Sequence, residues 1–137
     1  MSAAEVFFDT SILLYLLSPD ARKADRVEAL LGAGGAISVQ VLNEFASAAR
    51  RKADLSWPDV REVLGAVRAA CVTHPVTEKI HDSGVDVAER YGFSVYDSMI
   101  VAAAQGAGCT TLFSEDLPHR QVIDGRLTVR NPFIGAS

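Results

Sequence analysis

Residues 6–11 read Val6-Phe7-Phe8-Asp9-Thr10-Ser11, an apolar run followed by residue types that begin helices. The apolar part is short, aromatic and β-branched, which is typical of a buried strand. Asp, Thr and Ser are preferred at helix N-caps. The pattern therefore predicts a strand that ends at Phe8, a helix that begins directly after it, and a carboxylate, Asp9, at the end of the strand.

The same order of strand and helix is repeated along the chain. Apolar and β-branched runs predict further strands at 36–39, 71–73, 109–113 and 127–130, and helical spacing predicts helices at 12–17, 22–31, 40–52, 56–67, 77–91 and 95–104. Residues 114–125 read as a loop. Because parallel strands need crossover connections, which are usually helical, we expect a three-layer α/β/α domain with a central, mostly parallel sheet of four to five strands.

Composition bounds the class of protein. The chain has 137 residues, of which 49% are hydrophobic and 22% charged, so we expect one folded domain spanning 1–137. No run approaches the roughly 20 apolar residues of a membrane span, and the first residues carry acids where a signal peptide has lysines, so a cytoplasmic protein is expected. Cys71 and Cys109 form no Cys-x-x-Cys pair and are expected to be free thiols. The net charge of -4 argues against a strongly basic nucleic-acid coat and leaves room for a local basic patch.

Four carboxylates are expected at one edge of this sheet. Asp9 ends the first strand, and Asp116 follows the strand that ends at Phe113. Glu44 lies just over one turn into the helix after the second strand, and Asp97 lies in the first turn of the helix before the fourth. Ligands of such sheets bind outside the carboxyl ends of the strands.

Clustered carboxylates indicate a cation. Two of them about 4 Å apart repel by roughly 4 kcal/mol at an effective dielectric near 20, so a cluster must be protonated or hold a cation. Oxygen ligands without His or Cys favour Mg²⁺ or Mn²⁺, and magnesium favours phosphate substrates. The hypothesis from these residues is metal-dependent hydrolysis of a phosphodiester.

Each acid also has a purely structural interpretation. Asp9 would cap the first helix and Glu44 would be an exposed helix residue. Asp97 occupies the acid position of a capping box, and Asp116 would be a surface loop residue. The hydroxyls of Thr10 and Ser114 either support these carboxylates or serve as ordinary caps. The residues alone leave both interpretations open.

Four short motifs occur in a fixed order: Val6-Phe-Phe-Asp9-Thr-Ser11, Asn43-Glu44-Phe45, Tyr96-Asp97-Ser98 before an alanine-rich helix, and Ser114-Glu-Asp116-Leu117. In this order and spacing they resemble the PIN-domain ribonucleases, and among them the VapC-type toxins of type II toxin-antitoxin modules. The resemblance covers nearly the whole chain, including Asn131-Pro132-Phe133 near its end.

The resemblance implies a PIN-like α/β/α fold and a Mg²⁺- or Mn²⁺-dependent endoribonuclease that hydrolyses RNA phosphodiester bonds. It also implies a homodimer and inhibition by a cognate VapB-like antitoxin. Carried over by position, the catalytic and metal-binding acids are Asp9, Glu44, Asp97 and Asp116, with Thr10 and Ser114 as supporting hydroxyls. Glu115 is the alternative to Asp116 as the acid of the loop.

Two other functions fit an aspartate after the first strand. A Mg²⁺-dependent phosphoacceptor or phosphatase-like module also has one, but receivers have an acidic pair there, and the phosphatase pattern needs a second aspartate where this chain has Ser11. A catalytically silent PIN-fold binding module would keep the fold for a protein partner. The four intact acids argue against the silent module.

Overall fold

The computed structural model describes residues 5–134, in which six strands form one sheet. Its strands are β1 (Val6–Phe8), β2 (Gly35–Ser38), β3 (Cys71–His74), β4 (Thr111–Phe113), β5 (Val122–Ile123) and β6 (Leu127–Arg130). Their order in the sheet is β3-β2-β1-β4-β6-β5. All neighbouring pairs are parallel except β5 and β6. The mostly parallel sheet predicted from the sequence is confirmed.

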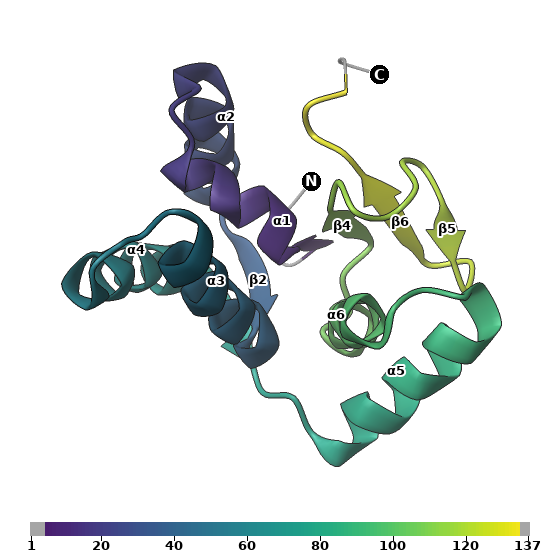
Figure 1. Cartoon of the computed structure of the whole chain (residues 1–137). Helices are drawn as coiled ribbons and strands as arrows, with labels where there is room; N and C mark the ends of the chain where they lie inside the picture. The colour runs from purple at the N-terminus through teal and green to yellow at the C-terminus, as the bar shows by residue number, and fades with distance from the viewer. Residues whose placement is uncertain (1–4, 135–137) are drawn as a thin grey trace.

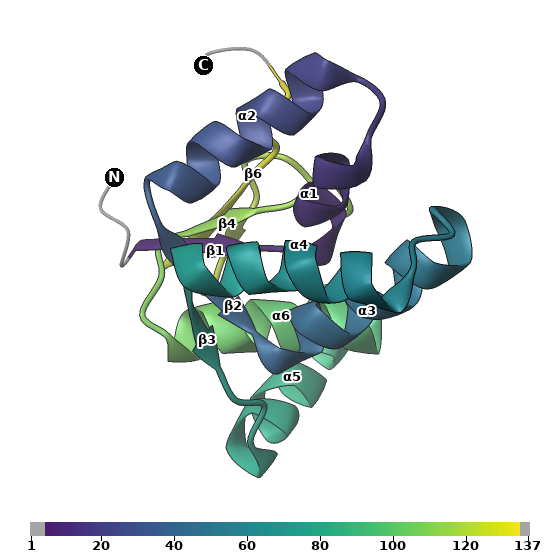
Figure 2. The same cartoon turned by 90° about the vertical axis from the view of Figure 1, so that its left-hand side faces the viewer.

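The helices cover both faces of this sheet. They are α1 (Thr10–Leu13), the 3-10 helix η2 (Leu14–Leu17), α2 (Ala21–Gly32), α3 (Val39–Lys52), α4 (Trp57–Ala70), α5 (Glu78–Tyr91) and α6 (Val95–Gly106). Figures 1 and 2 show α5 and α6 on one side and α1 to α4 on the other. Right-handed crossovers explain this division, because the chain moves from β1 to β3 in one direction and returns past β1 to reach β4. The three-layer α/β/α architecture is confirmed.

Three local expectations were wrong. The sheet has six strands rather than four to five, because β5 lies in the predicted loop and two residues are too few to show an alternating pattern. The helix predicted at 12–17 changes from α to 3-10 geometry at Leu14. Val39, predicted to end a strand, begins α3, because the Ser38 hydroxyl accepts a hydrogen bond from the Val41 amide and caps the helix.

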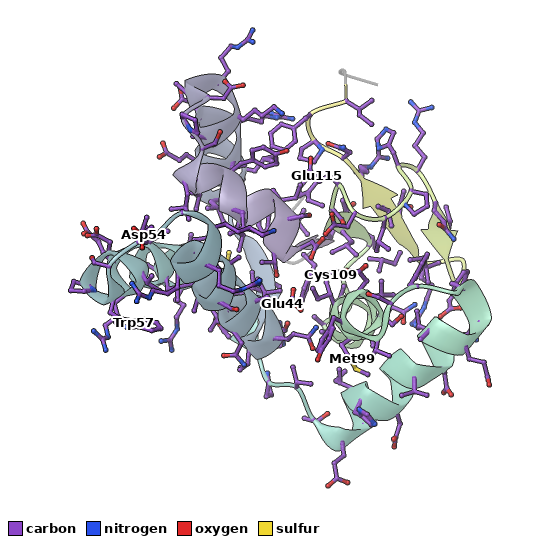
Figure 3. The ribbon with its side chains drawn as sticks, in the orientation of Figure 1. Glu44, Asp54, Trp57, Met99, Cys109 and Glu115 are labelled. Atoms are coloured by element: carbon purple, nitrogen blue, oxygen red, sulfur yellow. The ribbon has the colours of Figure 1, made fainter. Side chains whose placement is uncertain are left out.

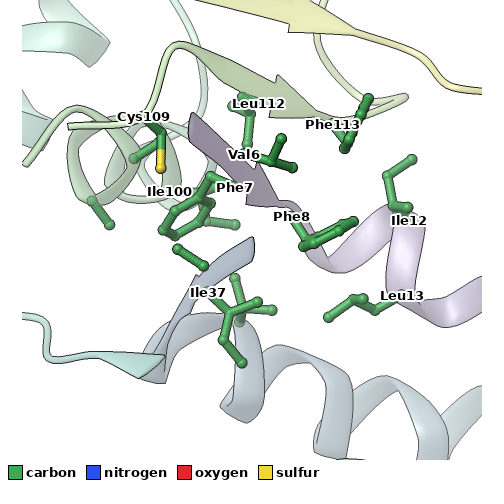
Figure 4. Packing of buried hydrophobic residues seen from close by; sticks show 14 of the residues in the cluster. Val6, Phe7, Phe8, Ile12, Leu13, Ile37, Ile100, Cys109, Leu112 and Phe113 are labelled. Atoms are coloured by element: carbon green, nitrogen blue, oxygen red, sulfur yellow. The ribbon is translucent and has the colours of Figure 1, made fainter. Parts of the chain in front are cut away.

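β1 lies at the centre of the hydrophobic core. Phe7 and Phe8 are both fully buried, and they point to opposite faces of the sheet as neighbours on a strand must. Figure 4 shows Phe7 near Ile100 of α6, and Phe8 on the side of Ile12 and Leu13 of α1. Burial of this strand on both faces explains why its sequence is a continuous apolar run.

In the described part of the chain, no disulfide joins the two cysteines, Cys71 and Cys109. Burial raises the pKa of the Cys71 thiol and of the Cys109 thiol to about 11. Within residues 5–134, no helix has the length and apolarity needed to cross a membrane.

Candidate metal centre and substrate groove

Three of the four predicted acids meet at the carboxyl edge of the sheet. Asp9 follows β1, and its amide donates a hydrogen bond to the Phe113 carbonyl at the end of β4, 2.9 Å away. Asp116 lies in the loop after β4, and Asp97 lies in the first turn of α6. One carboxylate oxygen from each of Asp9, Asp97 and Asp116 lies within 4.8 Å of the other two. Segments far apart in the chain thus place three carboxylates together.

Two hydroxyls fix the buried carboxylate of Asp9. Ser11 Oγ and Ser114 Oγ both donate hydrogen bonds to Asp9 Oδ2, at 2.8 and 2.7 Å. Ser114 Oγ also accepts a hydrogen bond from the Asp116 amide at 3.2 Å, which ties the loop to the same point. Among the described residues, none donates a hydrogen bond to Asp9 Oδ1. This oxygen therefore keeps its lone pairs for another ligand.

Burial and the charges of neighbouring acids oppose ionisation of Asp9 and Asp116. Burial raises the pKa of Asp9 to about 6, the hydroxyls of Ser114 and Ser11 lower it in part, and the charges of Asp116 and Asp97 raise it further. The pKa of Asp116 is also raised, chiefly by burial and then by Asp97 and Glu115, while Lys52 lowers it. A divalent cation would remove this penalty. The all-oxygen donor set fits Mg²⁺ or Mn²⁺.

Glu44, the fourth predicted acid, is not part of this group of three. Its Oε1 accepts a hydrogen bond from Thr10 Oγ1 at 3.0 Å, and its Oε2 accepts one from Gln40 Nε2 at 2.8 Å. The Thr10 hydroxyl therefore contacts Glu44, whereas Ser114 contacts Asp9. Glu44 connects the start of α1 to α3.

Gln40 is a residue that sequence reasoning missed. Its Nε2 also donates a hydrogen bond to the Tyr96 carbonyl at 2.8 Å, so one amide links Glu44 to the N-terminal turn of α6, which carries Asp97. The available signal was the four-residue spacing between Gln40 and Glu44, which puts both side chains on one face of a helix. Ser11 is a second such residue. The sequence predicts only a capping role for it, whereas its hydroxyl contacts the Asp9 carboxylate.

The two adjacent loop acids have different surroundings. Both carboxylate oxygens of Glu115 accept the Tyr15 hydroxyl, at 2.8 and 2.9 Å, and this hydrogen bond raises the pKa of Tyr15. The Tyr15 ring packs edge-on against Phe133, with ring centroids 4.6 Å apart. Asp116 instead lies with Asp9 and Asp97. The fold thus separates two acids that the sequence could not distinguish.

A groove of about 1060 Å³ passes over this edge of the molecule. Glu44 on α3 and Glu115 after β4 both line it (Figure 3). One face of α3 forms much of its wall, through Val39, Gln40, Asn43, Glu44, Ser47, Ala48, Arg51 and Lys52. Asp116, one acid of the cluster, also lines the groove. The cluster therefore borders a cleft large enough for part of a polymeric substrate.

Comparison with known proteins identifies the family. A family model described as the PIN domain matches residues 6–123. The chain belongs to the PIN-domain family. A search of curated proteins found no match to this PIN domain.

Solved structures similar to this PIN domain come from toxin-antitoxin systems. One is a toxin-antitoxin complex from Klebsiella pneumoniae, with 21% identity and a TM-score of 0.70 over 94% of this chain and 98% of that chain. Another is DNA-bound VapBC from Salmonella typhimurium, with 16% identity and a TM-score of 0.69 over 95% and 98% of the two chains. VapC20 of Mycobacterium tuberculosis, described as a toxin that cleaves the sarcin-ricin loop, has 16% identity and a TM-score of 0.63 over 80% and 88%. These similarities support the PIN fold along nearly the whole chain.

Proposed function

We propose that this PIN domain is a Mg²⁺- or Mn²⁺-dependent endoribonuclease and the toxin of a toxin-antitoxin pair, with residues 1–137 acting as a single nuclease domain. The observation that carries the proposal is the meeting of three carboxylates from separate segments beside a groove that one of them, Asp116, lines. VapC20 is a toxin that cleaves the sarcin-ricin loop, and the other similar structures come from toxin-antitoxin systems; both support the proposal.

In this proposal Asp9, Asp97 and Asp116 hold the metal, and Glu44 completes the acidic site from its position against Thr10 and Gln40. When bound, Mg²⁺ or Mn²⁺ would polarise the phosphate and lower the pKa of an attacking water. Because the bound cation would balance the negative charges of the cluster, it would also let Asp9 ionise near neutral pH.

The remaining work falls to groups of the chain itself. Ser11 and Ser114 donate hydrogen bonds to Oδ2 of Asp9 and so fix the orientation of its carboxylate. The other oxygen, Oδ1, is thereby held in one position. Ser114 holds the Asp116 amide with the same hydroxyl, so movement of the loop and movement of Asp9 are coupled. Fixed ligands matter because stabilisation of developing charge depends on groups that need no rearrangement during the reaction.

Cleavage of RNA with Mn²⁺, compared with chelator, tests the nuclease. Asp9→Asn and Asp97→Asn should each lower the rate by roughly 10²- to 10³-fold, the usual cost of losing an electrostatic group at the reacting phosphate. Asp124→Asn is the matched control, because Asp124 binds Gln105, Tyr91 and Arg90 away from the groove. Full activity in both site variants would disprove the nuclease site.

A second pair of variants decides between the adjacent loop acids. Asp116→Asn should lose activity as Asp9→Asn does, since its carboxylate lies in the cluster. Glu115→Gln should lose far less, because Tyr15 holds the Glu115 carboxylate. The reverse order of the two rates would assign the metal to Glu115.

We propose a VapB-like antitoxin and a homodimer as the partners. Expression of the wild type alone should arrest growth, and co-expression of the small protein encoded next to it should restore growth. Asp9→Asn should be tolerated without that protein. Normal growth with an active enzyme would remove the toxin role and leave the nuclease role intact. Sedimentation of the purified chain tests the dimer.

A further inference from the structure

The two ends of the groove have opposite chemical character. At the start of α3 the wall is apolar, formed by Val39, Val76 and Tyr96. These side chains are 39%, 40% and 69% exposed, and Tyr96 is the most exposed large hydrophobic residue in the described part of the chain. Because these residues line one groove, together they offer an apolar surface on which a planar group of a ligand can pack.

The other end is cationic. Arg51 and Lys52 lie in the last turn of α3 and line the same groove. Arg51 Nε donates a hydrogen bond to Ser47 Oγ at 3.2 Å, which aligns the side chain along the helix. Lys52 lies near enough to Asp116 to lower the pKa of that acid. Positive charge therefore lies next to the acidic cluster on the side away from Tyr96.

The backbone under Tyr96 is fixed although its ring is free. Gln40 Nε2 donates to the Tyr96 carbonyl at 2.8 Å, and the amide of the next residue, Asp97, donates to the N-cap hydroxyl of Ser94 at 3.1 Å. The ring is thus held one residue from a carboxylate of the cluster, so whatever packs on it lies beside the reacting phosphate.

The length of the groove sets how much of a strand it can bind. α3 has 14 residues, so at 1.5 Å per residue it extends for about 20 Å. That is several times the ~3.4 Å between successive phosphates along one strand of a duplex, so the groove has room for more than one nucleotide of a more extended single strand. The groove has three features in a row. The aromatic ring matches a base, the metal centre matches the cleaved phosphate, and the two cations match a further phosphate of the same strand.

We propose that Tyr96 is the stacking platform for a base next to the cleaved bond, and that Arg51 and Lys52 bind a phosphate on the other side of that bond. The inference rests on the proposed nuclease function and adds to it how the substrate is bound. The substrate is single-stranded RNA, because a base must be unstacked to lie on the ring.

The test measures kcat/KM with Mn²⁺ on a labelled single-stranded RNA oligomer that contains one cleaved bond. The same oligomer is then used with the base on either side of that bond removed in turn. For the wild type, loss of the stacked base should lower kcat/KM by roughly 5- to 150-fold, the range expected for one base–aromatic stack. Tyr96→Ala should show this loss on the intact oligomer and no further loss on the abasic one. Tyr96→Phe should behave as wild type.

Trp57→Ala is the matched control, because Trp57 is also an exposed aromatic residue, 52% exposed, at the start of α4. It packs under Arg50 of α3 and does not line the groove. Trp57→Ala should leave kcat/KM unchanged on the intact oligomer and on the abasic one. Loss of both Arg51 and Lys52 should reduce the salt dependence of substrate binding by about 0.7 in log–log slope, the value for one phosphate contact on a single strand, and Arg51→Ala and Lys52→Ala should each give part of that reduction. Arg61→Ala, an exposed arginine of α4, should leave the slope unchanged.

The outcomes separate the two proposals. If the wild type cleaves no RNA, the nuclease function fails and this inference fails with it. If the wild type cleaves RNA but Tyr96→Ala keeps the same sensitivity to base removal, only the stacking role is overturned. It is also overturned if Tyr96→Ala converts a sedimenting dimer to a monomer while base sensitivity is retained, because the ring then contacts a second copy of the chain. An unchanged salt slope in both Arg51→Ala and Lys52→Ala overturns the phosphate site.

Discussion

Substitution of Asp9 by asparagine should stabilise the metal-free protein at neutral pH. Asp9 is 3% exposed, and burial raises its pKa from an ordinary value of 3.8 to about 6. Between these two pH values the folded chain binds more protons than the unfolded chain, so the free energy of unfolding falls as the pH rises. At 1.36 kcal/mol per pKa unit, the full loss is about 3 kcal/mol.

Asparagine avoids this loss and keeps the local contacts. Its side-chain oxygen can accept the hydrogen bonds that Ser11 and Ser114 donate to Asp9 Oδ2. In chelator, Asp9→Asn and wild type should therefore have equal stability near pH 4. At pH 7 to 8 the variant should be more stable by about 3 kcal/mol, which corresponds to an increase in Tm on the order of 10 °C for a domain of this size.

Thermal melts across pH 4 to 8 measure this difference, and Asp124→Asn is the control of opposite sign. The Gln105 amide, the Tyr91 hydroxyl and the Arg90 charge lower the pKa of Asp124. Its stabilising contribution is present at neutral pH and lost on acidification, so Asp124→Asn should be less stable than wild type at pH 7 and converge with it at low pH. A Tm of Asp9→Asn equal to or below that of wild type throughout this range would refute the buried, raised-pKa carboxylate.

Three further outcomes are expected. Mn²⁺ at about 100 times its Kd should stabilise the wild type by about 2.7 kcal/mol in melts, and Asp97→Asn should lose most of that gain at the same concentration. Gln40→Ala removes two hydrogen bonds, including one to Glu44. Its free energy of unfolding, measured in urea, should fall by about 1 to 3 kcal/mol. Its kcat should fall by a larger factor than its KM rises. Gly35→Ala would place a Cβ 2.6 Å from the buried ring of the last β1 residue and should cost about 1 to 3 kcal/mol. Gly65→Ala on α4, with nothing within 4 Å, should instead gain up to about 1 kcal/mol.

The sequence determined the order of strands and helices and the edge where the site lies. Phe7 and Phe8 are apolar in succession because β1 is buried on both faces, and such a run is visible without a structure. Asp9 and Asp116 follow strands that parallel pairing brings side by side. These features follow from local pattern and from the few topologies open to an α/β chain, so they could be predicted.

The tertiary structure decided which acids meet and what each one touches. Glu44 lies outside the group of three because Thr10 and Gln40 hold both its oxygens, and Tyr15 from a distant segment holds Glu115 apart from Asp116. The strand β5 exists only through its pairing with β6. Each of these depends on side-chain directions and register that packing imposes across long sequence separations. No local spacing encodes such directions, because they are set by the elements on the other side of the contact.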